Sequence, residues 1–314
     1  MMIPETNDAI AVVTGAGNGI GASFARLLYH SGYRLFLVDL RREHLEAVCQ
    51  SLEGESYRLD SRIETHVADL TDRSSVEVLA DRLASTPNID LLVNNAGFGS
   101  LQEFTDVDVQ RHADMITIHV ETPTRLVHAV LPMMKLRNRG GIINVASLGA
   151  FAPCAQAVQY ASTKAYLVIF SEALQEELRG TGIRVQALCP GFVRTAFHMT
   201  DAMKSFHDRR IPGNLWTTPD EVAACSLRCL SSGRVVVIPG WRSRMIGLLM
   251  RMVLLKPIVR AATRPRAQLN RAQLNLQCPS PAPVARPLRL PAEGSPTLRA
   301  SANAETWLGS VRKP

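Results

Sequence analysis

Seven short apolar runs recur along the first 240 residues, and their spacing restricts the fold more than any other feature of the sequence. The runs lie at 9–13, 34–38, 63–67, 89–93, 141–146, 184–188 and 234–238. Amphipathic or alanine-rich stretches of helical length lie between most of them. Because strands that alternate with helices form βαβ units, we predict an α/β fold with a doubly wound, seven-stranded parallel sheet and helices on both faces.

Two long helices are predicted within the same pattern. One extends from about residue 157 to 179, and Gly180 and Gly182 favour a stop at its C-terminal end. The other extends from about 107 to 137. Pro123 and Pro132 are expected to bend or interrupt it, because proline lacks a backbone donor and clashes with the preceding turn.

Charge divides the chain into unequal parts. Residues 241–314 contain 13 Lys and Arg and two acidic residues, whereas residues 1–240 have a net charge of −4. We predict a folded domain at 1–240, an apolar, basic helical segment at 241–264 and a disordered, Pro- and Arg-rich tail at 265–314. Since the positive charge belongs to this C-terminal extension, the overall charge of +7 does not indicate nucleic-acid binding by the domain.

The segment 244–263 is apolar with interspersed Arg and Lys and contains no acidic residue. Three interpretations stay open: packing within an oligomer, peripheral contact with a membrane surface, or neither. A membrane span is disfavoured, because Arg251, Lys256 and Pro257 interrupt the apolar run.

The N-terminus and the cysteines indicate the compartment. Residues 1–8 show neither the basic region nor the apolar core of a secretory signal, and none of the six cysteines forms a CxxC pair. We therefore predict a reducing, cytoplasmic location, with contact at a membrane surface left open. Cys225 and Cys229 are interpreted as small buried side chains of a helix, and no metal site is predicted.

A glycine-rich turn follows the first strand. It reads Thr14-Gly15-Ala16-Gly17-Asn18-Gly19-Ile20-Gly21, and a helix comes next. Glycines let the backbone approach a pyrophosphate, which then lies at the positive end of the helix. The spacing is TGxxxGxG and not GxGxxG, because position 20 is Ile. The turn predicts a dinucleotide site; a turn that serves only packing is the alternative.

Asp39 ends the second strand, 18 residues beyond Gly21. An acidic residue at this place binds the 2′- and 3′-hydroxyls of an adenosine ribose and repels a 2′-phosphate. It therefore favours NAD over NADP. Arg41 and Arg42 stand close enough to weaken this argument, so NADP stays the alternative.

Further candidate groups follow later strands. Asp69 comes after the third strand, Asn94–Gly97 after the fourth, Ser147 after the fifth and Pro190-Gly191 after the sixth. Because ligands of open α/β sheets bind along the carboxyl edge of the strands, we expect these groups to form one site.

Tyr160 and Lys164 lie four residues apart on the long helix, hence on one face, and Ser147 precedes Tyr160 by 13 residues. A phenol, with an ordinary pKa of ~10, is a poor base at neutral pH, and a nearby ammonium lowers that pKa. Tyr160 would then exchange a proton with a hydroxyl while a hydride moves to or from a nicotinamide. Ser147 would orient the reacting oxygen, and Lys164 would also hold the nicotinamide ribose.

Residues 8–240 resemble the short-chain dehydrogenase/reductase family, whose members have a Rossmann fold and a Ser-Tyr-Lys site. The motifs that carry the resemblance are TGAGNGIG at 14–21, NNAG at 94–97, Ser147, YASTK at 160–164 and PGFVRT at 190–195. The resemblance implies an NAD(P)-dependent oxidoreductase acting on CH–OH groups, with 1–240 as its Rossmann-type catalytic domain. It implies Ser147, Tyr160 and Lys164 as catalytic residues, and a homodimer or homotetramer built through the long helices.

The same resemblance implies contacts along the whole cofactor. They are Thr14, Gly15, Asn18, Gly19 and Ile20 at the diphosphate, Asp39 at the adenosine ribose, Asp69 and Leu70 beside the adenine, Asn95, Ala96 and Gly97 on the cofactor, Tyr160 and Lys164 at the nicotinamide ribose, and Pro190, Gly191, Val193 and Thr195 over the nicotinamide.

One position departs from the family pattern. Many members have an Asn in the helix before Ser147 that holds a water and relays protons to the lysine. His119 occupies that position here. A histidine would hold the same water, titrate near neutral pH or simply pack in the helix, and these alternatives stay open.

The segment after Pro190 resembles the substrate lobe of the family, at about 192–218. Candidate pocket residues are Phe151, Phe192, Phe197, Met199 and Trp216. This apolar lining favours a small hydrophobic alcohol or ketone over a sugar, with packing of the lobe onto the sheet as the alternative for each residue. The predicted function is interconversion of a hydrophobic secondary alcohol and its ketone with NAD. The alternatives are an NADP-linked carbonyl or 3-oxoacyl-type reductase and a non-catalytic dinucleotide-binding sensor.

Overall fold

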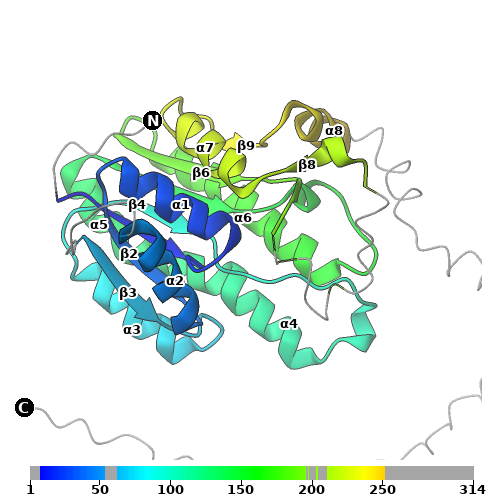
Figure 1. Ribbon diagram of the computed structural model, residues 1–314. Coiled ribbons are helices and arrows are strands. Elements are labelled where there is room, and N and C mark those ends of the chain that lie inside the picture. The colour runs from blue at the N-terminus through cyan, green and yellow to red at the C-terminus, as the bar shows by residue number, and fades with distance from the viewer. Residues whose placement is uncertain (1–7, 54–61, 196, 198–202, 204–210, 252–314) are drawn as a thin grey trace, which may run out of the picture. The chain divides into compact units, whose positions relative to one another are not determined.

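The computed structural model describes residues 8–53, 62–195, 197, 203 and 211–251 (Figure 1). Seven parallel strands form one sheet in the order β3-β2-β1-β4-β5-β6-β9. They are β1 (Ile10–Thr14), β2 (Arg34–Asp39), β3 (Ile63–Val67), β4 (Ile89–Asn94), β5 (Gly140–Val145), β6 (Ile183–Leu188) and β9 (Val236–Val237). Each strand overlaps its predicted range, so the predicted α/β fold and seven-stranded parallel sheet are confirmed.

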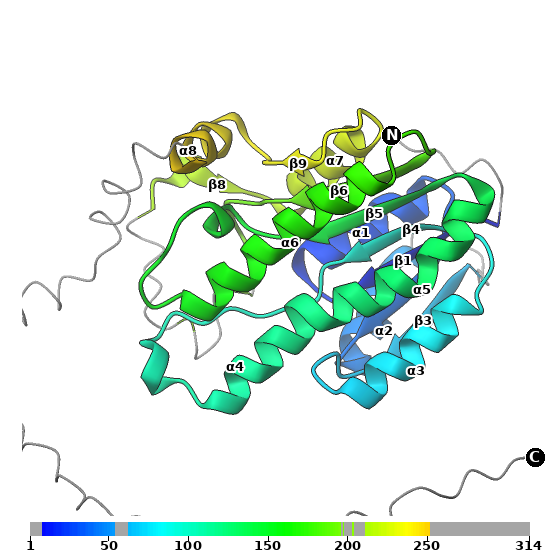
Figure 2. The same ribbon diagram turned by 180° about the vertical axis from the view of Figure 1, so that it is seen from behind.

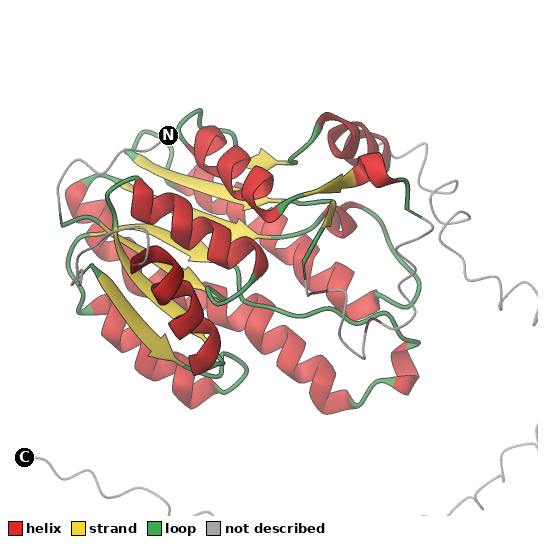
Figure 3. Ribbon diagram, viewed as in Figure 1, coloured by secondary structure: helices red, strands yellow, loops and turns green. Residues whose placement is uncertain are grey.

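Helices cover both faces of the sheet. α1 (Gly19–His30), α2 (Arg42–Glu53) and α7 (Pro219–Leu230) lie in front of it in Figure 1. The opposite face, seen in Figure 2, carries α3 (Arg73–Ala84), α5 (Thr122–Arg137) and α6 (Val158–Glu177). The layers of helix, strand and helix are distinguished by colour in Figure 3. The fold is therefore doubly wound, as expected.

Alternating side chains of the strands build two separate cores. Val13 and Val93 are buried with Phe24 of α1 in the first core cluster. Their neighbours Val12 and Leu92 are buried on the other face, with Leu126 of α5, in the second core cluster. This period of two, apolar on both faces, is what a sheet covered by helices requires. Cys225 and Cys229 of α7 pack against the first core cluster, and the described residues contain no group of three or more side chains suited to a metal ion.

The predicted helix at 107–137 is interrupted, but not at both prolines. α4 (Val109–Ile116) continues through a π turn at Thr117–Glu121 into α5, and Pro123 stands in the first turn of α5. Pro132 does not interrupt the helix, because α5 continues through it; a bend at Pro132 stays a prediction. Val130 and Met134 on either side are buried in the second core cluster, so packing outweighs the lost hydrogen bond.

Two further pieces complete the described part of the chain, in the predicted substrate lobe and after it. A short parallel pair joins β7 (Phe192–Val193) to β8 (Trp216–Thr217). α8 (Trp241–Arg251) lies in the predicted helical segment 241–264, of which the rest, like the predicted tail at 265–314, falls outside the described residues. Among the residues that are described, no helix is both long and apolar enough to span a membrane.

Candidate active site

The turn after β1 is held by the segment after β4. Asn95 Nδ2 donates to the backbone oxygens of Thr14 and Gly15, at 3.0 Å each. Thr14 Oγ1 accepts hydrogen bonds from the backbone N–H groups of Asn95 and Ala96, at 3.0 and 3.1 Å. The structure thus brings together two motifs that are far apart in the sequence, and it gives Asn95 the task of fixing the turn.

The glycines of this turn form a cradle that side chains would fill. Gly15 has a φ of +62°, and a Cβ added there would lie 2.9 Å from Ala96 Cα. A Cβ at Gly21 would collide with the backbone oxygen of Gly15. Within the described residues the Asn18 side chain makes no capping hydrogen bond to α1, so backbone N–H groups at this helix start remain for an anionic ligand. The turn fits the pyrophosphate of a dinucleotide.

Asp39 is oriented by two backbone donors. Its Oδ2 accepts from Gly17 N at 2.9 Å, and its Oδ1 accepts from Arg41 N at 3.1 Å. Gly17 has no room for a side chain, since a Cβ there would lie 2.5 Å from His44 Cβ and 3.0 Å from Asp39 Oδ2. The carboxylate is therefore fixed directly beside the glycine turn, where an adenosine ribose would lie.

The segment 190–195 connects the glycine turn to the Ser147 side of the site. Leu148 N donates to the Pro190 oxygen at 2.8 Å. At the other end Thr195 lies against Gly19, whose added Cβ would be 3.0 Å from Thr195 Cγ2. Val193 is buried between them, and Gly191 lies against Ser243 of α8. The segment thus spans the carboxyl edge of the sheet.

Three of the predicted cofactor-binding residues also make contacts within the protein. Asp69 Oδ1 accepts from the backbone N–H and the hydroxyl of Thr71, at 2.9 and 2.7 Å. The Leu70 oxygen accepts from Thr122 Oγ1 at 2.9 Å, and the Leu70 side chain is buried in the second core cluster. Ile20 packs against the first core cluster. Their cofactor contacts stay predictions.

Ser147, Tyr160 and Lys164 come together at the carboxyl end of β5. Ser147 follows β5 and begins a short 3-10 helix, η3 (Leu148–Phe151), and its Oγ accepts from Gly149 N at 3.1 Å. Ser147 and Tyr160 flank Gly149, where an added Cβ would lie 3.5 Å from Ser147 Oγ and 3.9 Å from Tyr160 Cε1. Lys164 Nζ donates to the Val145 oxygen at 2.8 Å and lies 5.9 Å from the centre of the Tyr160 ring. The three side chains form one cluster on α6 and its neighbouring strand.

Burial dominates the ionisation of this cluster. It lowers the pKa of Lys164 from 10.5 to about 7, an effect that the nearby Cys189 opposes. Burial also raises the pKa of Tyr160, while the neighbouring Ser147 hydroxyl lowers it and Cys189 raises it. Burial therefore opposes the predicted lowering of the Tyr160 pKa by the Lys164 ammonium, because a low-dielectric site disfavours both charged forms; that lowering stays a prediction.

His119 lies in the π turn and faces the same site. Its Nδ1 is 2.9 Å from Thr163 Oγ1, and that hydroxyl donates its own proton to the Tyr160 backbone oxygen at 3.0 Å. The hydrogen-bond network therefore assigns the proton to Nδ1 and a lone pair to Nε2. Nε2 is buried without a hydrogen-bond partner among the described residues, and a Cβ at Gly97 would collide with it. Burial, helped by Lys164, lowers the pKa of His119 well below its ordinary value.

The predicted pocket residues separate into groups. The Phe197 ring lies 6.0 Å from the Tyr160 ring, and Phe197 and Met203 both lie against Gly99. Phe192 and Trp216 contact each other at 5.8 Å between ring centres in the β7–β8 pair. Phe151 is partly buried and packs against a third core cluster, as do Ile246 and Met250 of α8. Met199 falls outside the described residues.

Sequence reasoning did not assign Thr163 or Cys189 to the site. Thr163 holds His119 through the contact just described. Cys189 is fully buried and interacts electrostatically with both Tyr160 and Lys164. In the sequence, only their positions next to recognised motifs point to them. Thr163 lies within YASTK, and Cys189 immediately precedes Pro190.

Comparisons with known proteins show what this chain is similar to. The family model described as short chain dehydrogenase matches residues 9–205. An uncharacterised oxidoreductase of Staphylococcus saprophyticus is 33% identical over 192 residues, which are 61% of this chain and 81% of that protein.

Similar solved structures come from the same class of enzyme. A short-chain dehydrogenase from Sphingobium yanoikuyae in complex with NADPH has a TM-score of 0.67 and 27% identity, covering 88% of this chain and 99% of its own. The bulky-bulky ketone specific alcohol dehydrogenase from Comamonas testosteroni has a TM-score of 0.66 and 25% identity, covering 90% of this chain and 100% of its own. A Burkholderia phymatum protein of 22% identity in complex with NAD shares the fold, with a TM-score of 0.65 over 91% of this chain and 100% of its own.

Proposed function

This chain belongs to the short-chain dehydrogenase/reductase family and is an NAD(P)-dependent oxidoreductase, and from that premise we propose that it interconverts a bulky, hydrophobic secondary alcohol and its ketone. The main support for this reaction is the arrangement of the candidate catalytic residues. Ser147, Tyr160 and Lys164 form a cluster at the carboxyl edge of the sheet, with the aromatic ring of Phe197 beside Tyr160.

Tyr160 is the general acid/base of the proposed reaction. In reduction its phenolic proton passes to the carbonyl oxygen of the substrate, and in oxidation Tyr160 takes the proton from the alcohol. Ser147 would turn its hydroxyl proton from Tyr160 to the same oxygen of a bound substrate, while its Oγ stays held by the N–H of Gly149. A bound nicotinamide cofactor supplies or accepts the hydride.

The fit of the glycine cradle indicates which residues would hold that cofactor. The backbone of Gly15–Gly19 and the start of α1 would bind its pyrophosphate. Asp39 would bind the adenosine ribose, and Lys164 would reach the nicotinamide ribose. The segment 190–195 would cover the nicotinamide, with Val193 and Thr195 at its carboxamide.

Asp39 supports NAD as the preferred cofactor. Its carboxylate is held beside the glycine turn by two backbone donors, so it does not readily turn away from a 2′-phosphate. An NADP-linked carbonyl or 3-oxoacyl-type reductase remains the second candidate. It is favoured by the adjacent Arg41 and Arg42 and by the NADPH in the similar Sphingobium structure.

An apolar, aromatic wall supports a bulky hydrophobic substrate. Phe197 and Met203 lie together against Gly99, next to Tyr160. Apolar walls with few polar groups bind hydrophobic ligands and leave orientation to the polar cluster. The name of the similar Comamonas enzyme, specific for bulky-bulky ketones, supports the same substrate class.

His119 is proposed to hold a proton-relay water by accepting a hydrogen bond at Nε2. Thr163 fixes the tautomer that leaves a lone pair there, and the lowered pKa keeps the ring neutral at ordinary pH. This favours the role of a fixed acceptor over that of a group titrating near neutral pH.

The test is a turnover screen with a matched pair of variants. Wild-type protein is assayed with NADH and NADPH on a panel of bulky apolar ketones, and with NAD and NADP on the corresponding alcohols, by nicotinamide absorbance. Tyr160→Phe is expected to lower kcat by about 100-fold or more, because general acid/base catalysis contributes about that much. NADH binding should stay within about two-fold of wild type.

Tyr166→Phe is the control, since Tyr166 lies on the same helix and bonds Thr124 outside the cluster. It should retain full activity. A wild-type protein that binds NADH but turns over none of the panel would favour the non-catalytic sensor, and a Tyr160→Phe variant with unchanged kcat would refute the assignment of Tyr160.

A further inference from the structure

α8 has an inner side that is firmly attached to the domain. Ser243 and Gly247 are buried, and Ile246 and Met250 pack into the third core cluster. A Cβ added at Gly247 would lie 2.6 Å from Ile238 and 3.0 Å from Leu148. These four positions recur at helical spacing, so the opposite side of α8 must point away from the protein.

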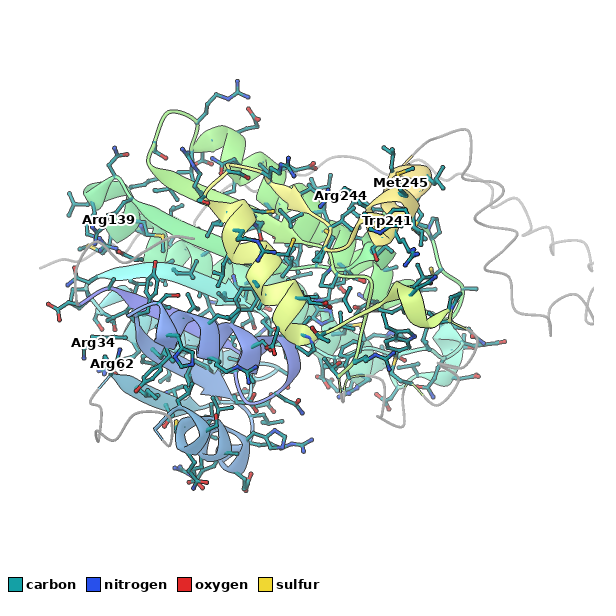
Figure 4. The ribbon with its side chains drawn as sticks, turned by 45° about the horizontal axis from the view of Figure 1, so that its top comes forward. Arg34, Arg62, Arg139, Trp241, Arg244 and Met245 are labelled. Carbon is teal, nitrogen blue, oxygen red and sulfur yellow. The ribbon has the colours of Figure 1, made fainter. Side chains whose placement is uncertain are left out.

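The outer side of α8 is apolar and exposed. Trp241, Met245, Leu248 and Leu249, here named the outer stripe, follow one another at helical spacing. Trp241 is 67% exposed and Leu248 is 55% exposed. Figure 4 shows Trp241 and Met245 projecting from α8, at the end of the molecule opposite Arg34 and Arg62. Large apolar side chains gathered in this way mark a binding surface.

Positive charge accompanies the outer stripe. Arg242 and Arg244 are exposed, and the helical spacing places one on each side of the stripe. The Arg242 guanidinium lies 4.8 Å from the centre of the Trp241 ring. α8 contains no acidic residue, and in the sequence the first one after it is Glu293. A partner complementary to the outer stripe and its flanking arginines would be apolar and would also carry negative charge.

We propose that the outer stripe of α8 binds the surface of an anionic phospholipid bilayer, with the helix lying in the plane of the interface. The apolar side chains would enter the boundary between headgroups and acyl chains, and Arg242 and Arg244 would reach the phosphates on either side. Tryptophan suits this depth because its ring is apolar and its N–H is polar. The proposal is independent of the substrate and of the catalytic roles above.

A second copy of this chain fits the stripe less well. A two-fold symmetric contact through α8 would bring the arginines of both copies together, and α8 supplies no acidic residue to pair with them. A contact between α8 and the mildly acidic domain of another copy would not be symmetric, and it would extend into chains of molecules.

Flotation of the full-length protein with vesicles tests the proposal. The vesicles contain phosphatidylglycerol and phosphatidylcholine, or phosphatidylcholine alone. We expect binding to the anionic vesicles that weakens at about 1 M salt, where the Debye length is about 3 Å. The double variant Trp241→Gln/Leu248→Gln should bind at least about 10-fold more weakly, because it removes buried apolar area. Arg244→Gln should bind about 5-fold more weakly.

Matched controls come from exposed residues elsewhere. Val78→Gln on α3 removes a side chain that is 62% exposed, and Arg34→Gln removes a charge distant from α8. Both should float like wild type, and thermal unfolding and NADH binding should be unchanged in all four variants.

Three results would overturn the proposal. Absence of binding to anionic vesicles is the first. The second is vesicle binding that stays unchanged in Trp241→Gln/Leu248→Gln and in Arg244→Gln. Such a result would assign the membrane binding to the basic residues after α8 in the sequence. The third is a concentration-dependent oligomer that Trp241→Gln/Leu248→Gln dissociates without any effect on vesicle binding, which would assign the stripe to a second copy.

Discussion

At the scale of one residue, Asp39 is the proposed determinant of the preference for NAD over NADP. Both carboxylate oxygens accept backbone hydrogen bonds, which fixes the negative charge beside the glycine turn, where we propose that the adenosine ribose binds. We expect kcat/KM to be at least about 10-fold higher with NADH than with NADPH, since about 1.4 kcal/mol of repulsion suffices for that factor. Asp39→Ser should remove most of the preference, as measured by initial rates with each cofactor.

The double variant Arg41→Ala/Arg42→Ala separates the two cofactor hypotheses. If Asp39 dominates, the variant changes NADH kinetics little. A strong wild-type preference for NADPH that this variant abolishes would instead establish the arginines as the determinants.

Lys164 makes stability depend on pH. The folded chain releases its proton near the lowered pKa of about 7, whereas the unfolded chain keeps it up to the ordinary value of 10.5. Between those pH values the unfolded state binds more protons, so the contribution of Lys164 to stability rises with pH and is smallest below 7.

Lys164→Met, which has no titrating group, provides the comparison. In denaturant unfolding of cofactor-free protein, wild type should gain at least about 1 kcal/mol relative to Lys164→Met between pH 7 and pH 10. Parallel pH curves for the two proteins would mean that the pKa of Lys164 is not lowered in the folded state.

At the scale of an element, the π turn between α4 and α5 determines where His119 lies. Such turns insert one extra residue into a helix and are frequent at functional sites. Here the turn contains His119, whose Nδ1 contacts Thr163 on α6. The helix is thereby bound to the helix that carries Tyr160 and Lys164.

His119 variants test whether this link serves catalysis. His119→Ala should lower kcat by about 10-fold or more, whereas His119→Asn, whose amide oxygen also accepts a hydrogen bond, should restore most of it. The pH profile of kcat around neutral pH should be the same for wild type and His119→Asn, because the lowered pKa of His119 favours its neutral form. A profile that loses a transition in His119→Asn would show that His119 titrates during turnover.

The helices also show what a sequence pattern leaves undetermined. The limits of α6 agree with prediction because its stop at Gly180 is a local signal, with a φ of +85° that suits glycine. The π turn has no such signal. Its His119 contacts Thr163 of α6, far away in the sequence, and Pro132 is accommodated by a core built from distant strands.

At the scale of the whole molecule, the two cores stabilise the sheet from opposite faces. Leu92 is fully buried in the second core cluster. Leu92→Ala should lower the free energy of unfolding by about 2–5 kcal/mol, through lost burial and the cavity that remains. Leu40→Ala, at a side chain that is 59% exposed, should change it by less than about 0.5 kcal/mol. Equal effects in chemical denaturation would contradict the assignment of the core.

Periodicity predicts the fold and the edge of the site, but not its finer contacts. Strand spacing alone places Asp39, Asn95 and Ser147 at one edge, because parallel strands end together. The contact of His119 with Thr163 could not be predicted, since it joins residues 44 positions apart on separate helices. Phe151 is predicted in the pocket from its proximity to Ser147. Its packing against the third core cluster is a further contact that the sequence did not indicate, and its place in the pocket stays a prediction.

The strand order also affects how the chain folds as it is made. All neighbouring strands of the sheet are parallel, so crossovers join them and no hairpin provides a quick local start. β1 lies between β2 and β4, and its second edge is paired only once residues 89–94 have left the ribosome. Until then the future centre of the sheet is an unpaired edge open to other nascent chains. Slow translation of residues 15–88 would thus harm this enzyme by aggregation during synthesis, without any change in the stability of the finished fold.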